Sequence, residues 1–186
     1  MIGTSEWLET IPEDFSHWFA GCVDGEGSFV LIRGYGRRGL TKGSYHHRLA
    51  IGLHIQELPL LEEIRGILSM GDIQRKPAKD GHCSMAHLVF QRKRDCQRLV
   101  ALFQRFPLRS HKKKEFEIWA ECVNLWCSGI MADGLFRQAQ NRLKEVRYAY
   151  KRSIGGKTDA QAGQDQVGYQ SRGTGQESVP QSNRLF

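Results

Sequence analysis

Long apolar runs are missing from this sequence, and no stretch approaches the roughly 18 consecutive apolar residues of a membrane-spanning helix. The first residues also lack the order of a secretory signal peptide, in which basic residues precede an apolar segment. Cysteines are few, five in all, and none has the CxxC spacing of a zinc or redox site. We therefore expect a soluble, intracellular protein with reduced thiols, in either a bacterial cytoplasm or an organelle matrix.

Acidic residues are missing between Gly27 and Gln56, although this segment holds five basic residues: Arg33, Arg37, Arg38, Lys42 and Arg48. The whole chain has 27 Lys and Arg against 20 Asp and Glu, which gives a formal net charge of +7. Clustered Lys and Arg bind polyanions because they displace counterions from phosphates. Nucleic acid is therefore the favoured partner, ahead of an acidic membrane surface.

The spacing of apolar residues predicts one folded domain over residues 1–154 and a disordered tail, rich in Gly, Gln and Ser, over 155–186. The predicted elements are a helix over 14–24, strands over 29–32 and 49–55, a helix over 59–68, a hairpin over 72–91 that turns at 79–81, and helices over 95–106, 112–126 and 133–152. This order predicts an α+β fold in which helices cover one face of an antiparallel sheet.

Strand alternation divides the expected side chains between the two faces of that sheet. Leu49, Ile51 and Leu53 would face the helices. The other face would carry the polar side chains His46, Arg48, Asp72, Gln74, Lys76 and His87. We interpret this face as a DNA-binding surface; an ordinary solvated sheet face is the alternative.

The first predicted helix ends in the sequence Phe-Ala-Gly-Cys-Val-Asp-Gly-Glu-Gly, residues 19–27. This stretch resembles the nine-residue motif that names the LAGLIDADG homing endonucleases, with Glu in place of the second Asp. Residues 53–64 resemble the family's link from the second strand to the second helix. Residues 106–119 resemble its Pro-Leu-Arg-Thr-Lys-Lys segment and the helix that follows. The resemblance extends over residues 14–150.

The resemblance implies an αββαββα fold with a four-stranded antiparallel saddle sheet in each protomer and extra C-terminal helices. It also implies an intron-encoded, site-specific endonuclease that hydrolyses double-stranded DNA and leaves short 3′ overhangs. A chain with one motif is expected to act as a homodimer on a long pseudo-palindromic site. Since small residues let two helices approach closely, we expect the dimer interface at Phe19, Ala20, Gly21 and Val23.

The same resemblance assigns catalytic roles to the acidic end of the motif. Glu26 and the Gly25 carbonyl would bind Mg²⁺, with Mn²⁺ as a substitute and Ca²⁺ supporting binding without cleavage. Asp24 would lie at the same helix ends and belong to the catalytic group. A solvated acidic loop is the alternative that the residues alone leave open.

Two further catalytic positions are implied with open alternatives. Lys112 matches the lysine that the family places near the scissile phosphate, but Lys113 and Lys114 remain candidates because His111 replaces the first lysine of the family's pair. His54 stands where some members have a water-positioning glutamine, and a surface histidine without a role is the alternative. A catalytically inactive intron maturase, or another DNA- or RNA-binding relative, is the second candidate function.

Overall fold

The computed structural model describes residues 3–34, 44–78 and 83–155. The elements are α1 (Thr4–Glu9), α2 (Glu13–Glu26), β1 (Gly27–Gly34), β2 (Ser44–His54), η2 (Ile55–Glu57), α3 (Leu58–Leu68), β3 (Asp72–Lys76), β4 (Met85–Phe90), α4 (Lys93–Arg105), α5 (Lys112–Cys127) and α6 (Asp133–Ser153). The chain divides into two compact units, residues 1–147 and 148–186. The packing described below belongs to the first unit. Most of the tail expected over 155–186, and the turn expected at 79–81, lie outside the described residues.

The α+β order expected from the sequence is confirmed, with the short α1 and η2 added to it. Helix α1 has six residues, too few to form a recognisable apolar stripe, and it is held by a contact distant in the sequence. The Trp7 side chain is 2% exposed, and its Nε1 donates a hydrogen bond to the Leu68 carbonyl at 3.0 Å. Tertiary packing therefore stabilises helix α1, which the local sequence pattern does not predict.

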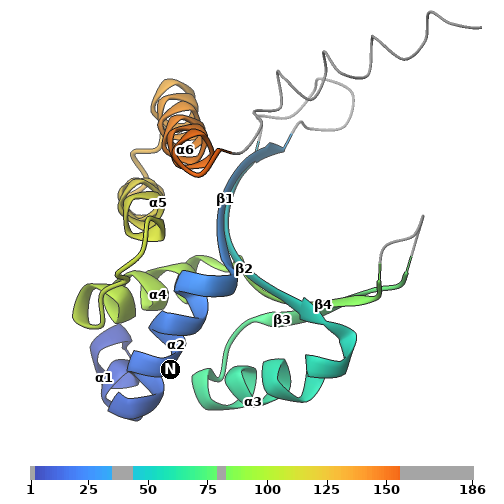
Figure 1. Ribbon diagram of the computed structural model, residues 1–186. Coiled ribbons are helices and arrows are strands. Elements are labelled where there is room, and N and C mark those ends of the chain that lie inside the picture. Colours follow the sequence, from blue (N-terminus) through green and yellow to red (C-terminus); the bar gives the residue numbers. More distant parts are fainter. Residues whose placement is uncertain (1–2, 35–43, 79–82, 156–186) are drawn as a thin grey trace, which may run out of the picture. The chain divides into compact units, whose positions relative to one another are not determined.

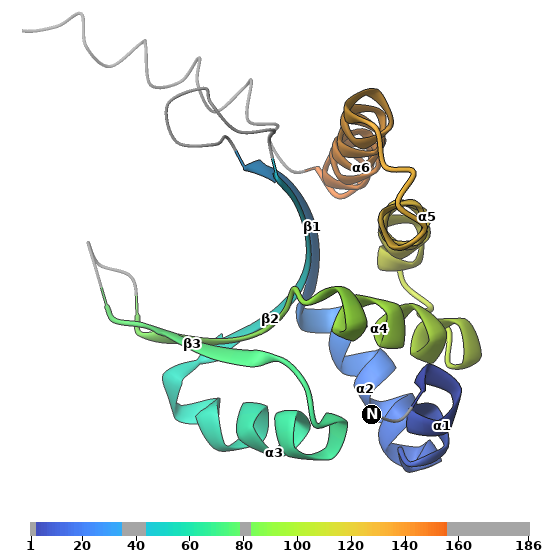
Figure 2. The same cartoon turned by 180° about the vertical axis from the view of Figure 1, so that it is seen from behind.

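The four strands form one antiparallel sheet in the order β1-β2-β4-β3. The register aligns Phe29, Leu49 and Phe90 across three strands, and all three side chains are fully buried. The sheet curves, and the helices of the first unit lie on its convex side (Figures 1 and 2). Within the described part of this unit, the concave face carries no helix.

Helix α2 passes directly into β1 at Gly27, and only glycine fits there. A Cβ at this position would lie 2.6 Å from both Cγ1 and the carbonyl oxygen of Val23, closer than real Cβ contacts. The Gly27 N–H also caps the helix by donating to that Val23 carbonyl. The last residue of the motif therefore joins helix to sheet without a loop, which fixes Glu26 at the edge of the sheet.

Helix α6 is tied to the sheet through polar side chains. Arg147 donates from Nε to the Glu115 carboxylate of α5 at 2.8 Å, and its guanidinium also donates to the Phe29 carbonyl. Gln140 donates to the Leu31 carbonyl at 2.8 Å. These bonds use carbonyls of β1, whose backbone has no strand partner on that side in the described sheet. The C-terminal helices thus cover the β1 edge and support it.

His47 on β2 is buried and lies on the opposite face of the sheet from its neighbours His46 and Arg48. It shares the helix-facing side of β2 with Leu49, is 0% exposed, and stacks on Trp126 with ring centroids 4.6 Å apart. Burial, aided by the charge of His46 and opposed by a backbone bond to Cys122, lowers the pKa of His47 to about 4. His47 is therefore neutral at pH 7.

The cysteines and helix lengths bear on the remaining sequence expectations. All five cysteines are free thiols; Cys96 and Cys122 are buried, which raises the pKa of each to about 12, whereas Cys83 is exposed. In the described ranges, every helix is too short or too polar to cross a membrane.

Candidate DNA-cleavage site

The two acidic residues of the motif have different surroundings. Asp24 accepts three hydrogen bonds from the segment that precedes α5: from Arg109 N at 2.7 Å, from Ser110 N at 3.2 Å and from Ser110 Oγ at 2.6 Å. Both carboxylate oxygens are used. Asp24 therefore positions a loop that is 85 residues away in the sequence, and its expected membership of the catalytic group stays a prediction.

That loop places Lys112 beside the motif. The Lys112 N–H donates to Ser110 Oγ at 3.1 Å, and the Lys112 ammonium donates to the Gly27 carbonyl. Lys112 is half-buried, whereas Lys113 and Lys114 are exposed. Among the three lysines left open by the sequence, the structure brings Lys112 to the end of α2.

The Glu26 side chain is exposed, and its carboxylate makes no hydrogen bond or ion pair with another described residue. It lies in the last turn of α2, where unsatisfied carbonyls and the helix dipole favour cations. Carboxylate and backbone carbonyl oxygens are ligands that suit a hard divalent cation. The described residues of one chain contain no group of three or more His, Cys, Asp or Glu that could hold a metal ion.

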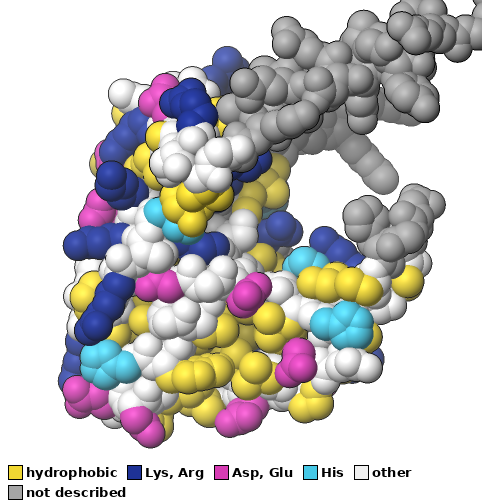
Figure 3. Space-filling view, viewed as in Figure 1, with side chains coloured by type: hydrophobic (Ala, Val, Ile, Leu, Met, Phe, Trp, Pro, Cys, Tyr) yellow, Lys and Arg dark blue, Asp and Glu magenta, His cyan; other side chains and the backbone are white. Residues whose placement is uncertain are grey.

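Most of the expected DNA-binding residues lie on the concave sheet face. The register places Arg48 opposite Val30, and aligns Gly52 with His87 and His87 with Gln74. His46 and His54 on β2 and Lys76 on β3 fall on this same face by strand alternation. Figure 3 shows Lys, Arg and His side chains within the concavity. The predicted division of side chains between the two faces is confirmed for these positions.

His87 occupies a special place at the middle of this face. A Cβ at Gly52 would lie 2.9 Å from the His87 ring, so the glycine leaves the space that the ring fills. Burial, with the charges of Lys76 and Arg48, lowers the pKa of His87. His87 is therefore a neutral hydrogen-bonding group in a basic surface.

His54 has a defined orientation at the end of β2. Its Nδ1 accepts a hydrogen bond from Gln56 N at 3.4 Å. In the neutral ring the proton is then on Nε2, which can donate to a water or an oxygen. Leu53, its neighbour on β2, packs against the core, as strand alternation predicts.

The expectation for Arg33 is corrected by the structure. Arg33 faces the helices, because it shares the side of β1 that carries Phe29 and Leu31, and its Nε lies 2.8 Å from the Asp133 carboxylate of α6. Its positive charge predicted a DNA contact, but charge alone does not tell which face of a strand a residue occupies. The other three basic hairpin residues, Arg37, Arg38 and Lys42, lie outside the described residues.

The residues expected at the dimer interface are corrected in part. Phe19 and Val23 are fully buried and Ala20 is 5% exposed, all within the core of their own chain. Gly21 is exposed, as is Gly25 one turn later. Helical periodicity explains the difference, since residues 19, 20 and 23 share the inner face of α2 while 21 and 25 lie outside.

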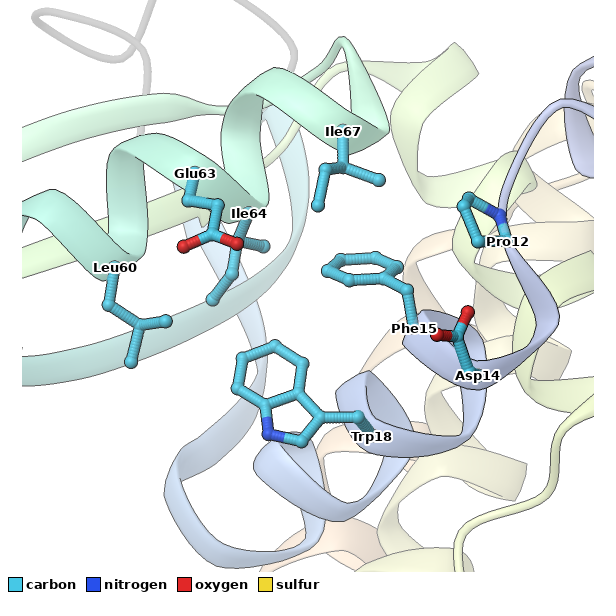
Figure 4. A pocket seen from close by; sticks show the side chains of 8 residues that line it. All are labelled: Pro12, Asp14, Phe15, Trp18, Leu60, Glu63, Ile64 and Ile67. Carbon is cyan, nitrogen blue, oxygen red and sulfur yellow. The ribbon is translucent and has the colours of Figure 1, made fainter.

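The sequence interpretation missed an apolar groove between α2 and α3, which we call the α2–α3 groove. Its apolar lining comprises Pro12, Phe15, Trp18, Leu60, Ile64 and Ile67. Figure 4 shows the Phe15 and Trp18 rings facing the α3 side chains, and Figure 3 shows hydrophobic side chains gathered over both helices. Trp18 is 46% exposed and lies one turn before Gly21. The signal available in the sequence was this tryptophan, which directly precedes the buried Phe19 but points away from the core.

Comparison with solved structures finds the same fold in homing endonucleases. The crystal structure of I-TnaI matches with a TM-score of 0.57 and 18% identity over 82% of this chain and 94% of that one. I-SmaMI bound to cleaved DNA matches with a TM-score of 0.56 and 19% identity over 70% of this chain, and I-SmaMI with uncleaved DNA and calcium ions matches with a TM-score of 0.55. This chain spans 42% of the I-SmaMI chain in both structures.

The sequence itself matches a family profile over residues 19–123, which is more than half of its 186 residues. The matched region begins at the first residue of the motif and ends in α5, so it contains the Asp24 contacts, Lys112 and the whole sheet. This chain belongs to the LAGLIDADG endonuclease family.

Proposed function

We propose that this protein is a site-specific endonuclease that cleaves double-stranded DNA as a homodimer with a divalent metal ion. The observation that carries the proposal is the network from Asp24 through Ser110 to Lys112, which sets an ammonium group beside the acidic end of α2. That end of the helix meets the edge of the concave basic face of the sheet. Positive charge and catalytic groups are thereby adjacent.

The proposed roles follow from the contacts. Arg48, Lys76 and their neighbours on the concave face would bind the DNA backbone and bases. Glu26 and the Gly25 carbonyl would hold Mg²⁺, which activates a water molecule and stabilises the leaving oxygen. The Lys112 ammonium would stabilise negative charge that develops at the phosphate. His54 would orient water through Nε2.

A second copy would complete the site, since each chain offers one exposed carboxylate at the end of α2. Gly21 and Gly25 form a small-residue stripe spaced by four on an exposed helix face, a pattern that permits close helix packing. Trp18 and the α2–α3 groove continue this surface with apolar side chains, which favour burial. We place the dimer interface there, in place of Phe19 and Val23.

The interface is tested by Gly21→Leu. A Cβ at Gly21 would meet no atom within 4 Å, so the fold of one chain tolerates the side chain while the partner helix would not. Gly134→Leu is the matched control, because a Cβ at that exposed helical glycine also has no neighbour within 4 Å. Sedimentation should find monomers for Gly21→Leu and dimers for the parent and the control. A parent that sediments as a monomer with and without DNA contradicts the proposal.

Cleavage is tested on a target selected from random duplexes by binding in Ca²⁺. Glu26→Gln keeps the side-chain size but removes the charge, and we expect cleavage in Mg²⁺ to fall by orders of magnitude while binding persists. Lys112→Met should also reduce cleavage, whereas the matched Lys113→Met should not. Equal cleavage by Glu26→Gln and the parent refutes the metal site. A parent that binds its target tightly and never cuts it supports the inactive, maturase-like alternative.

A further inference from the structure

On the concave sheet face, strand β1 carries Ser28 followed by two aliphatic side chains. Strand alternation puts Val30 and Ile32 on this face, because Phe29 and Leu31 between and beside them are buried against the helices. Ile32 is 42% exposed, one of the largest hydrophobic exposures among the described residues. An isolated exposed aliphatic residue needs no explanation, but Ile32 and the half-buried Val30 together form an aliphatic surface on a basic face.

Val30 and Ile32 each lie opposite a polar residue of β2. The register pairs Val30 with Arg48 and Ile32 with His46, and side chains opposite each other in antiparallel strands lie about 5 Å apart. A ligand that contacts the aliphatic pair therefore also meets positive charge. This combination favours DNA as the occupant over an apolar protein surface, because the DNA phosphates compensate the charge of Arg48 and an apolar surface does not.

The major groove of DNA offers one apolar group that matches this surface, the C5-methyl group of thymine. We propose that Val30 and Ile32 contact thymine methyl groups and so make part of each half-site methyl-dependent. This inference rests on the proposed function and extends it to a feature of the target. His87, Gln74 and Lys76, on β4 and β3, supply hydrogen-bonding groups for the remaining bases.

The position of these thymines follows from the strand. Ile32 lies six residues after Glu26 along an extended chain, which corresponds to roughly 20 Å at about 3.3 Å per residue. The methyl-dependent base pairs should therefore lie toward the outer part of the half-site. Base pairs next to the cleaved bonds, nearer Glu26 and His54, should be insensitive to the methyl group.

The experiment uses the full chain and a target selected from random duplexes in Ca²⁺. Each thymine is then replaced in turn by deoxyuridine, which removes the methyl group and keeps the base pair. We expect binding to weaken about fourfold at one or two outer positions, as burial of a methyl-sized group contributes about 0.8 kcal/mol. Ile32→Ala should weaken binding to the thymine duplex and abolish the difference between thymine and deoxyuridine at its position. Val30→Ala should do the same at a neighbouring position.

The matched control is Leu135→Ala, since Leu135 is also 42% exposed but lies on α6, away from the concave face. Its sensitivity to deoxyuridine should equal that of the parent. A target without methyl-sensitive positions, or a sensitivity that persists in both Ile32→Ala and Val30→Ala, overturns the inference while leaving site-specific binding intact. Failure to select any duplex at all refutes the proposed function instead.

Discussion

Replacing Asp24 by Asn should destabilise the protein, whereas replacing Glu26 by Gln should not. The two carboxylates are two residues apart in the motif, but Asp24 accepts three hydrogen bonds and Glu26 accepts none from the described residues. In Asp24→Asn the amide oxygen can still accept both Ser110 bonds. The amide NH₂ must then face the Arg109 N–H, which sets one donor against another.

The expected loss in the free energy of unfolding comes from these two opposed donors at Arg109. A hydrogen bond to a charged group contributes about 1.5–3 kcal/mol, and the Arg109 bond is open to solvent, so we expect a loss of about 2 kcal/mol in the free energy of unfolding. For a chain of this length such a loss lowers Tm by about 4–8 °C. Glu26→Gln changes an exposed side chain and should stay within about 0.5 kcal/mol of the parent.

Urea denaturation followed by tryptophan fluorescence measures both variants against the parent. All three are compared at one protein concentration, because dimerisation contributes to apparent stability. An Asp24→Asn midpoint equal to that of the parent contradicts the positioning role of Asp24. An equal loss in Glu26→Gln shows that the two carboxylates are not divided between structure and catalysis as the contacts indicate.

Two further predictions concern charge on the sheet and in the core. Arg48→Ala should weaken DNA binding and reduce the slope of log K against log salt concentration by about 1. Arg33→Ala removes a partner of Asp133 on the other face and should leave that slope unchanged. Equal slopes in salt titrations of the two variants refute the assignment of Arg48 and Arg33 to opposite faces. The pKa of His47 is lowered by burial from 6.5 to about 4, so the unfolded chain binds its proton first as pH falls. The parent should therefore lose about 3 kcal/mol of stability between pH 6.5 and 4 that His47→Leu does not lose, and parallel urea-midpoint profiles for the two proteins contradict this.

Most of the helices and strands were predictable from local patterns. The apolar stripe of α2, the alternation along β2 and the helical spacing of α3 each reflect burial on one face, a property that repeats within a few residues. For the same reason the division of Arg48 and Leu49 between opposite faces followed from parity alone. Strand alternation also puts Arg33 on the same face as Phe29 and Leu31, whereas the net charge of the hairpin says nothing about which face a residue occupies.

The sequence by itself determined the family, the acidic motif and the faces of the strands, because these depend on residue identity and short spacing. Only the tertiary structure decided that Asp24 binds the loop at Ser110, that Lys112 reaches the end of α2, and that Phe19 and Val23 belong to the core of their own chain. Each of these facts is a contact between segments far apart in the chain or a choice between two faces of one helix. Such contacts are set by how the helices pack against the sheet, and no local periodicity encodes that packing.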